Sequence, residues 1–281
     1  MVNRIGKTLI MASALMGSLA SAAETHPLMS SKYLVNLGIY FPSRDFEAKA
    51  FGNVGPPGRQ DQPVQFVDFE RSVGVNDRPE IFSFEMGWRF GSVWGVALQH
   101  FESKRTRRTV LSKSIEWDGM TYDAGVEVSA GTEVKITRVF FSRDFRNRDR
   151  HSLRLGAGIH YIKLGAEISG QATLEDMSTG FHRGVVSASV PVPNIGAWYR
   201  YSPSARWLFS TRLDWFSADL GDFSGGIWNV ATGANYRLTD KIGIGLSYQF
   251  FELGGTIRET NWKGDIRTRF DGPVIYLTGF W

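Results

Sequence analysis

The chain has 281 residues, of which 42% are hydrophobic, and a formal net charge of only +4 from 32 basic and 28 acidic residues. Such a near balance of charges gives no reason to expect a nucleic-acid partner. The chain contains no cysteine, which excludes a disulfide framework, thiol catalysis and cysteine-ligated zinc.

The N-terminus has the three parts of an export signal. Arg4 and Lys7 precede an apolar stretch that ends near Ala20, and the small residues Ala20-Ser21-Ala22 predict cleavage before Ala23. A retained transmembrane anchor would need ~20 apolar residues, and a lipoprotein would need a cysteine. Removal of 1–22 takes away two positive charges and no acid, so the formal net charge falls from +4 to +2. Residues 23–30 are predicted to form a short periplasmic segment.

From residue 31 onward the chain repeats with period two, the pattern typical of β-strands. Val35, Leu37 and Ile39, for example, alternate with Asn36 and Gly38. The same alternation of one apolar face with one face of glycines, amides and charges occurs in 82–90, 94–99, 153–161, 194–201, 207–215, 228–238 and 242–250.

Aromatic residues favour a membrane barrel over a soluble sandwich, whose strands would also be half buried. Tyr199, Tyr201, Trp207 and Tyr236 fall on the apolar face close to strand ends, where the interfacial girdle of a barrel would lie.

The links between strands have two lengths. Short links with turn residues occur at 91–92, 147–149, 202–204 and 239–240, and long polar links are predicted at 43–78, 105–130, 169–185, 218–225 and 256–266. Short periplasmic turns and long outer loops are the arrangement of outer-membrane barrels. The fold expected for 31–281 is therefore all-β: a transmembrane, antiparallel, up-and-down β-barrel of about ten strands.

Two segments leave eight or twelve strands open. In 133–145, Arg138 shares a face with apolar residues, so either a bulge resets the register or Arg138 lies near a membrane interface. Residues 64–75 would extend the second strand or form an extra hairpin.

The last strand ends on an aromatic residue, with Ile275, Leu277, Phe280 and Trp281 as its apolar members. This ending resembles the C-terminal strand of Gram-negative outer-membrane β-barrels, in which a terminal Phe or Trp is part of the signal read by the insertion machinery. The resemblance implies export to the outer membrane, lipid and lipopolysaccharide as surroundings, and assembly by the barrel-assembly machinery. We expect a monomer.

The polar faces of the strands carry charges that would meet in the lumen. The predicted lumen charge network consists of Glu85, Arg89, Arg154, Arg200, Arg212, Asp214 and Arg237. Lys135 and His160 are placed inside as well, and Gly156, Gly158, Gly233, Gly243 and Gly245 would leave space beside these groups. A barrel of eight to ten strands is narrow enough for side chains to fill, so the network is expected to plug the lumen. A narrow channel for ions or small solutes is the alternative. No cofactor or metal is expected.

A surface hydrolase is the less favoured alternative, and no catalytic residue is predicted. The omptin proteases resemble this chain in size and strand count and use an Asp-His pair at the extracellular rim. Here the Asp-x-His spacing occurs at Asp149-Arg150-His151, in a predicted periplasmic turn. Outer candidates lack that spacing: His100, Glu102, His182, Asp219 and Asp222. Lipid A deacylases and phospholipases use a Ser with a nearby His, but adjacent His151 and Ser152 would point to opposite faces of a strand.

A basic run leaves the third strand on the predicted extracellular side. It contains Lys104, Arg105, Arg107 and Arg108. At the level of lipopolysaccharide phosphates these side chains would form charge-assisted hydrogen bonds; the alternative is an ordinary solvated loop.

Overall fold

The computed structural model describes residues 24–52, 67–68, 80–117, 120–148, 150–174, 177–220, 223–258 and 262–281. The predicted signal, 1–22, lies outside these ranges. Within them, no helix has the length and apolar character needed to cross a membrane. The elements are η1 (Pro27–Met29), β1 (Tyr33–Tyr40), β2 (Ser43–Gly52), β3 (Val67–Asp68), β4 (Ile81–Phe90), β5 (Trp94–Val110), β6 (Ile115–Trp117), β7 (Met120–Tyr122), β8 (Glu127–Arg148), β9 (His151–Leu174), β10 (Met177–Tyr201), β11 (Trp207–Leu220), β12 (Phe223–Arg237), β13 (Ile242–Arg258) and β14 (Trp262–Phe280).

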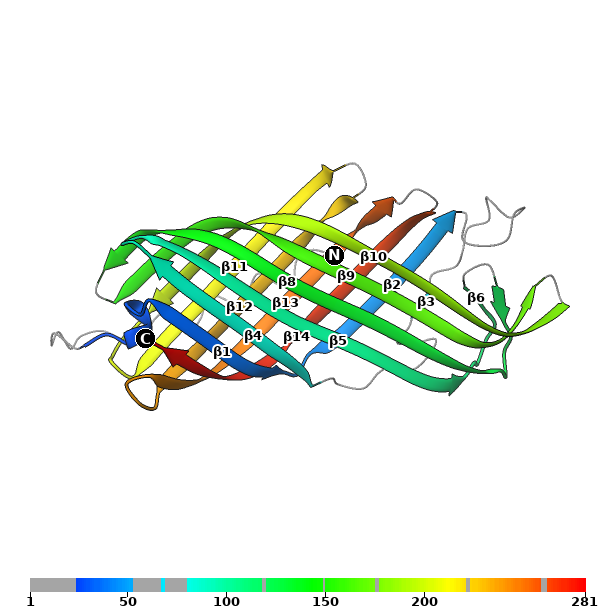
Figure 1. Cartoon of the computed structure of the whole chain (residues 1–281), viewed down its shortest axis with the longest axis horizontal. Coiled ribbons are helices and arrows are strands. Elements are labelled where there is room, and N and C mark those ends of the chain that lie inside the picture. Colours follow the sequence, from blue (N-terminus) through cyan, green and yellow to red (C-terminus); the bar gives the residue numbers. More distant parts are fainter. Residues whose placement is uncertain are drawn as a thin grey trace, which may run out of the picture.

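The strands close into an antiparallel barrel (Figure 1). Each wall strand pairs with the next one in the order β1-β4-β5-β8-β9-β10-β11-β12-β13-β14, and β14 pairs back to β1 from Leu34↔Phe280 to Tyr40↔Val274. In the part of the chain that the structure describes, the wall therefore has ten strands, as expected. The alternatives of eight and twelve are wrong.

The extra strands lie off this closed wall. β2 continues the line of β1 along β14 after a break at Pro42. Gly272 lies opposite this break, and a side chain at that position would collide with the backbone of Phe41 and Pro42. β6 pairs with β7. Of the ambiguous residues 64–75, the structure describes β3, which pairs with β2; the others lie outside the described residues.

The two ends of the barrel differ. Tight connections lie at the end that holds the C-terminus, at the left of Figure 1, whereas β8, β9 and β10 reach far beyond the yellow, orange and red strands at the other end. We call these the turn end and the tall end. The polar links predicted at 105–130, 169–185, 218–225 and 256–266 are mostly strand, so the expectation of long loops there is wrong.

The reason is that the two faces of the wall exchange their character along its height. On β9, the outward side chains Leu155, Ile159 and Tyr161 are apolar or aromatic and exposed, and the inward ones are Arg154 and His160. Beyond Tyr161 the pattern reverses: Lys163 and Glu167 point outward, while the inward side chains are Ile162, Leu164, Ala166 and Ile168.

This reversal marks where the surroundings of the wall change. Apolar side chains facing out belong in lipid, and charged side chains facing out around an apolar interior belong in water. The tall end is thus built like a soluble barrel that stands on a membrane barrel. A prediction that assigns polar segments to loops therefore misses strands whose outward face is charged.

The same reversal explains β8. Arg138 is 1% exposed and points inward, together with Val134, Ile136 and Phe140. Lys135, predicted inside, instead faces outward and pairs with Glu102. A register shift does occur between Asp144 and Arg146, but it lies nearer the turn end and does not change the face of Arg138.

The predicted aromatic girdle lies on the outer face near the turn end. Tyr199 and Trp207 are exposed there, and Trp207 contacts the Tyr236 ring edge to face at 4.9 Å between centroids. Tyr201 stacks on His151 at 4.8 Å.

The chain before β1 covers the lumen at the turn end. Pro27 begins η1, and the Nδ1 atom of His26 accepts a hydrogen bond from the Leu28 backbone, so His26 caps this short helix. Leu28 packs with Met29, Leu208 and Phe280 in a buried cluster. Phe280 therefore points into the barrel.

Candidate functional site in the lumen

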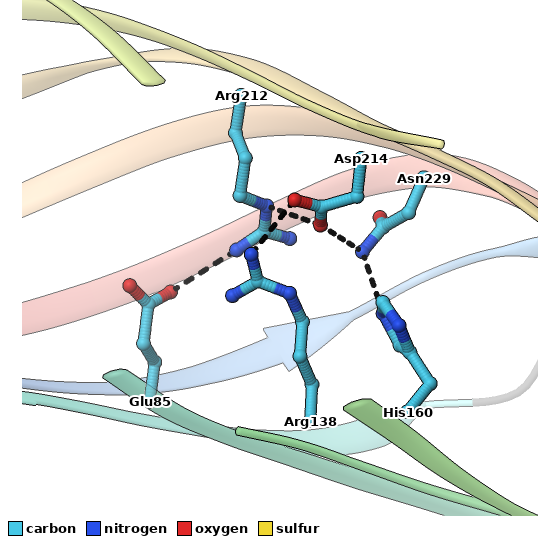
Figure 2. Close-up of polar contacts among 6 residues, drawn as sticks. All are labelled: Glu85, Arg138, His160, Arg212, Asp214 and Asn229. Atoms are coloured by element: carbon cyan, nitrogen blue, oxygen red, sulfur yellow. Dashed lines mark hydrogen bonds and ion pairs between the residues drawn. The ribbon is translucent and has the colours of Figure 1, made fainter. Parts of the chain in front are cut away.

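The centre of the lumen is a buried ion pair between β8 and β11. Arg138 donates from Nη2 to Asp214 Oδ1 at 2.7 Å, and the two side chains are 1% and 0% exposed. Figure 2 shows them pointing toward each other from opposite sides of the lumen, with Asn229 donating to the second carboxylate oxygen at 3.1 Å. The Nδ2 atom of Asn229 also lies 3.4 Å from His160 Nε2. The pair thus cross-links facing walls.

Arg212 extends this network. Its guanidinium lies 3.7 Å from Asp214 and 3.8 Å from Glu85 (Figure 2). Arg212 and Asp214, both placed in the lumen by the sequence, are buried and lie next to each other. Because one carboxylate faces two arginines, each arginine has donors left over: Arg138 Nε and Nη1 and Arg212 Nε and Nη2 have no hydrogen-bond partner among the described residues.

Aromatic rings take up part of that surplus charge. The Arg138 guanidinium lies 4.1 Å from the Phe140 ring centroid, and Phe140 stacks on Trp198 at 5.7 Å with an angle of 7° between the rings. Arg200 and Arg212 also lie within 5.9 Å of the Trp198 ring, the range of cation–π attraction.

Glycines on the neighbouring strands make this packing possible. A side chain at Gly156 or Gly158 would collide with Phe140, and one at Gly196 would collide with the Asp214 carboxylate. Tyr276 lies in the same way over Gly245. The interior glycines therefore leave room for aromatic rings and a carboxylate. These groups fill space that the sequence analysis had considered as a path for a solute.

A second charged cluster lies closer to the turn end. Arg154 donates to both oxygens of Asp144, from Nε at 2.6 Å and from Nη2 at 3.1 Å. Ser152 donates to the same carboxylate at 3.1 Å. Arg89 and Arg200 lie alongside Arg154 around a small cavity of about 20 Å³, and Arg200 donates to the Leu28 carbonyl at 3.2 Å. The cluster thus holds η1 in place.

The structure brings together all but one of the predicted lumen charges. Arg237 lies at the turn end, where it pairs with exposed Asp240 at 3.9 Å, and is not part of the network. Arg138, Asp144 and Asn229 were missed. Arg138 was detectable as a charge on an apolar face, but the reversal of faces that places it inside was not.

An apolar layer lies across the lumen above the ion pairs, toward the tall end. The rings of Phe101, Phe251 and Phe270 contact one another at 6.0–6.3 Å between centroids, and Tyr40 lies 6.1 Å from Phe101. The layer, taken from strands around the wall, consists of Tyr40, Phe101, Val134, Ile136, Ile162, Leu164, Val192, Ile227, Phe251 and Phe270. Apart from the Tyr40 hydroxyl, which donates to the Gln249 carbonyl at 3.5 Å, the side chains of this layer are apolar, and an apolar layer is an unfavourable environment for an ion.

Below this layer the lumen has a cavity of about 110 Å³. Its lining includes Arg200, Arg212, Glu85 and Asn235, with Leu28 from η1 at the turn end. The cavity therefore lies between the apolar layer and η1.

The basic run lies on β5, not in a loop as predicted. Lys104 and Arg108 are exposed, as is Arg107, and Arg105 is partly buried. Charges of both signs surround this region: Lys135 pairs with Glu102 at 2.9 Å and with Glu133 at 3.0 Å. The hydrogen bond from Lys135 lowers the pKa of Glu133 below its usual range. These ion pairs lie just above the part of the wall whose outward side chains are apolar.

Two of the residues weighed for catalysis, His151 and His100, lie in different parts of the barrel. His151 lies at the turn end and bonds the Tyr199 hydroxyl at 2.7 Å, while His100 bonds Thr137 at 2.8 Å on the outer face of the wall. Asp149 and Asp222 lie outside the described residues. The described residues contain no group of three or more His, Asp or Glu side chains placed to hold a metal ion.

Comparisons with known proteins identify the fold. The outer membrane protease OmpT from Escherichia coli matches with a TM-score of 0.56 and 11% identity, over 88% of this chain and 97% of that one. Ail of Yersinia pestis (11% identity, 86% and 97% covered) and a Pseudomonas aeruginosa FadL homologue (12% identity, 92% and 93% covered) match with TM-scores of 0.32, too low to carry an argument. No protein-family model and no curated protein matches the chain. The chain thus has the closed-barrel fold of Gram-negative outer-membrane proteins, with no single family assigned.

Proposed function

We propose that the mature protein is a closed, non-conducting barrel of the outer membrane that holds a tall, water-exposed wall above the cell surface as a scaffold for surface interaction. The observation that carries this proposal is the continuous apolar layer across the lumen. The cross-lumen pair of Arg138 and Asp214 lies beneath it, and η1 covers the turn end. The turn end would be periplasmic, and the tall end extracellular.

A planar-bilayer recording on refolded protein tests the closed lumen. Wild-type protein should show no steady conductance, because an ion would have to cross the apolar layer without water. A variant with Phe101, Phe251 and Phe270 all changed to Ala should show more frequent channel events. Stable, ion-selective currents from the wild type would instead support the narrow channel, with the same arginines lining its constriction.

The matched control is a triple change on the outer face. Ile159, Ile195 and Leu246 are exposed there, outside the lumen, and their replacement by Ala should leave conductance at the wild-type level. Equal conductance from the two triple variants would show that the apolar layer is not the barrier.

Location and processing follow from both ends of the chain. We infer that residues 1–22 are removed and that the protein fractionates with the outer membrane after delivery to the barrel-assembly machinery. N-terminal sequencing of protein from that fraction should begin at or near Ala23, and an intact Met1 in a cytoplasmic pool would contradict the inference.

Lipopolysaccharide is the partner that we propose for the charged belt around Lys104 and Arg108. Both cations lie on an outer strand face, above the level at which that face changes from apolar to charged. Their change to Gln should weaken co-purification of lipopolysaccharide, whereas Arg206→Gln at the turn end should have no effect. Retention of lipopolysaccharide by the outer variant would contradict this contact.

The protease alternative rests on the fold shared with OmpT alone. Low identity transfers no site, and His100 and His151 form hydrogen bonds with hydroxyl groups, of Thr137 and Tyr199. We therefore propose a protein without enzymatic activity.

A further inference from the structure

The lumen holds more positive than negative charge in the region between η1 and the apolar layer. The described side chains there include five arginines, Arg89, Arg138, Arg154, Arg200 and Arg212, against three acids, Glu85, Asp144 and Asp214. The difference of five and three leaves an excess of two positive charges over the acids. Arginine does not lose its proton in proteins, so this excess cannot be removed by titration.

The uncompensated donors face the larger cavity. Arg200 and Arg212 are each 8% exposed and both line the cavity of about 110 Å³. Arg212 Nη2 has no hydrogen-bond partner among the described residues. A water molecule needs about 10–15 Å³ of space measured in this way, so the cavity has room for a small oxyanion together with several waters.

Neutral donors complete the lining. Asn235 donates from Nδ2 to Thr278 at 2.9 Å, and both residues line the cavity beside Ser210, Ser247 and Gln249. Hydroxyl and amide groups with guanidinium groups form the donor set that holds sulfate or phosphate. Glu85 is the one carboxylate among the cavity's lining residues, and Arg212 lies 3.8 Å from it.

We propose that this cavity binds one small tetrahedral oxyanion of the sulfate or phosphate class, held by Arg200 and Arg212. A dianion would match the two excess positive charges. The anion would also connect β10 with β11 and, through the bond of Arg200 to the Leu28 carbonyl, would support η1 at the turn end.

Selenate, a sulfate analogue, is the probe. Protein purified from membranes in detergent is dialysed to equilibrium against selenate at constant ionic strength, and selenium per chain is measured by mass spectrometry. Wild-type protein should bind about one selenate per chain. Arg212→Gln should weaken binding about tenfold or more, because a charge-assisted hydrogen bond is lost.

Glu85→Gln provides a test with the opposite sign. Removal of the competing carboxylate should tighten selenate binding about tenfold, a gain that loss of folding cannot produce. Arg269→Gln is the matched control, because Arg269 pairs with Asp271 on the outer face, and it should bind like the wild type.

The proposal would be overturned by wild-type protein without saturable selenate binding. Unchanged or weakened binding in Glu85→Gln, or an equal loss in Arg269→Gln and Arg212→Gln, would overturn it too. The result is independent of the closed lumen: a conducting wild type that binds selenate at this site would contradict the proposed function and leave the anion site standing.

Discussion

Replacement of Asp214 by Asn should be among the most destabilising single changes in the barrel. Asp214 is fully buried, accepts hydrogen bonds from Arg138 at 2.7 Å and Asn229 at 3.1 Å, and lies 3.7 Å from Arg212. Its loss leaves two guanidinium groups near one neutral amide. Breaking a buried ion pair from one side costs about 3–5 kcal/mol, and we expect a loss of this size in the free energy of unfolding.

The opposite change, Arg138→Met, should cost less. Asp214 then keeps Asn229 and Arg212 as partners, and a Met side chain still packs against Phe140 and Trp198, so the loss is one charge-assisted hydrogen bond, about 1.5–3 kcal/mol. Urea titration in lipid vesicles, followed by tryptophan fluorescence, measures both values. Glu102→Gln, which breaks an exposed pair with Lys135, serves as the control at about 0–1 kcal/mol. Arg138→Met as costly as Asp214→Asn would refute the reasoning that one carboxylate serves two arginines.

Other predictions concern the outer face, the last strand and the turn end. Leu246→Arg, on the exposed apolar face, should lower the free energy of unfolding in vesicles by ~2–4 kcal/mol if Leu246 lies at midplane depth. Ser247→Arg instead places its side chain in the lumen cavity. A harmless Leu246→Arg would contradict the assignment of faces. Trp281→Ser should reduce the yield of heat-modifiable barrel far more than Trp262→Ser at the other end of β14, and equal yields would contradict an assembly role for the terminal residue. Burial lowers the pKa of His26 from 6.5 to about 4, so His26 stays neutral when η1 is docked and takes up a proton when η1 is released. Docking of η1 should therefore weaken as the pH falls from about 6.5 toward 4. The weakening would be seen as faster hydrogen exchange over 24–31, and His26→Gln should abolish this pH dependence.

The wall near the turn end could be predicted from sequence because the alternation of apolar and polar residues there always indicates which side chains face lipid and which face the lumen. Where lipid surrounds the barrel, an apolar residue faces out and a polar residue faces in. Alternation alone therefore predicts Arg212 and Asp214 inside the lumen, and in the structure both are buried. The count of ten strands followed in the same way from the turns between such segments.

The tall end could not be predicted because, within a single strand, the face that points outward changes from apolar to charged. Lys163 continues the outward face of Ile159 and Tyr161 on β9, although one belongs in water and the others in lipid. No local pattern separates a water-exposed strand extension from a polar loop. The ion-pair partners of Asp214 and Arg154 could not be predicted either, because Arg138 and Asp144 come from β8, whose inward face was not identified from the sequence.

The reversal of faces also explains where the apolar layer lies in the lumen. The wall above the belt has water outside, so only an apolar interior can stabilise it, and Phe101, Phe251 and Phe270 provide that interior. The wall below has lipid outside, and its stabilisation therefore comes from packing and polar pairs inside the narrow lumen. An apolar core above a charged network is what a single narrow barrel needs in order to stand partly in lipid and partly in water. The barrier to ions that we propose across the lumen would follow from that requirement for stability, without a separate selection for closure.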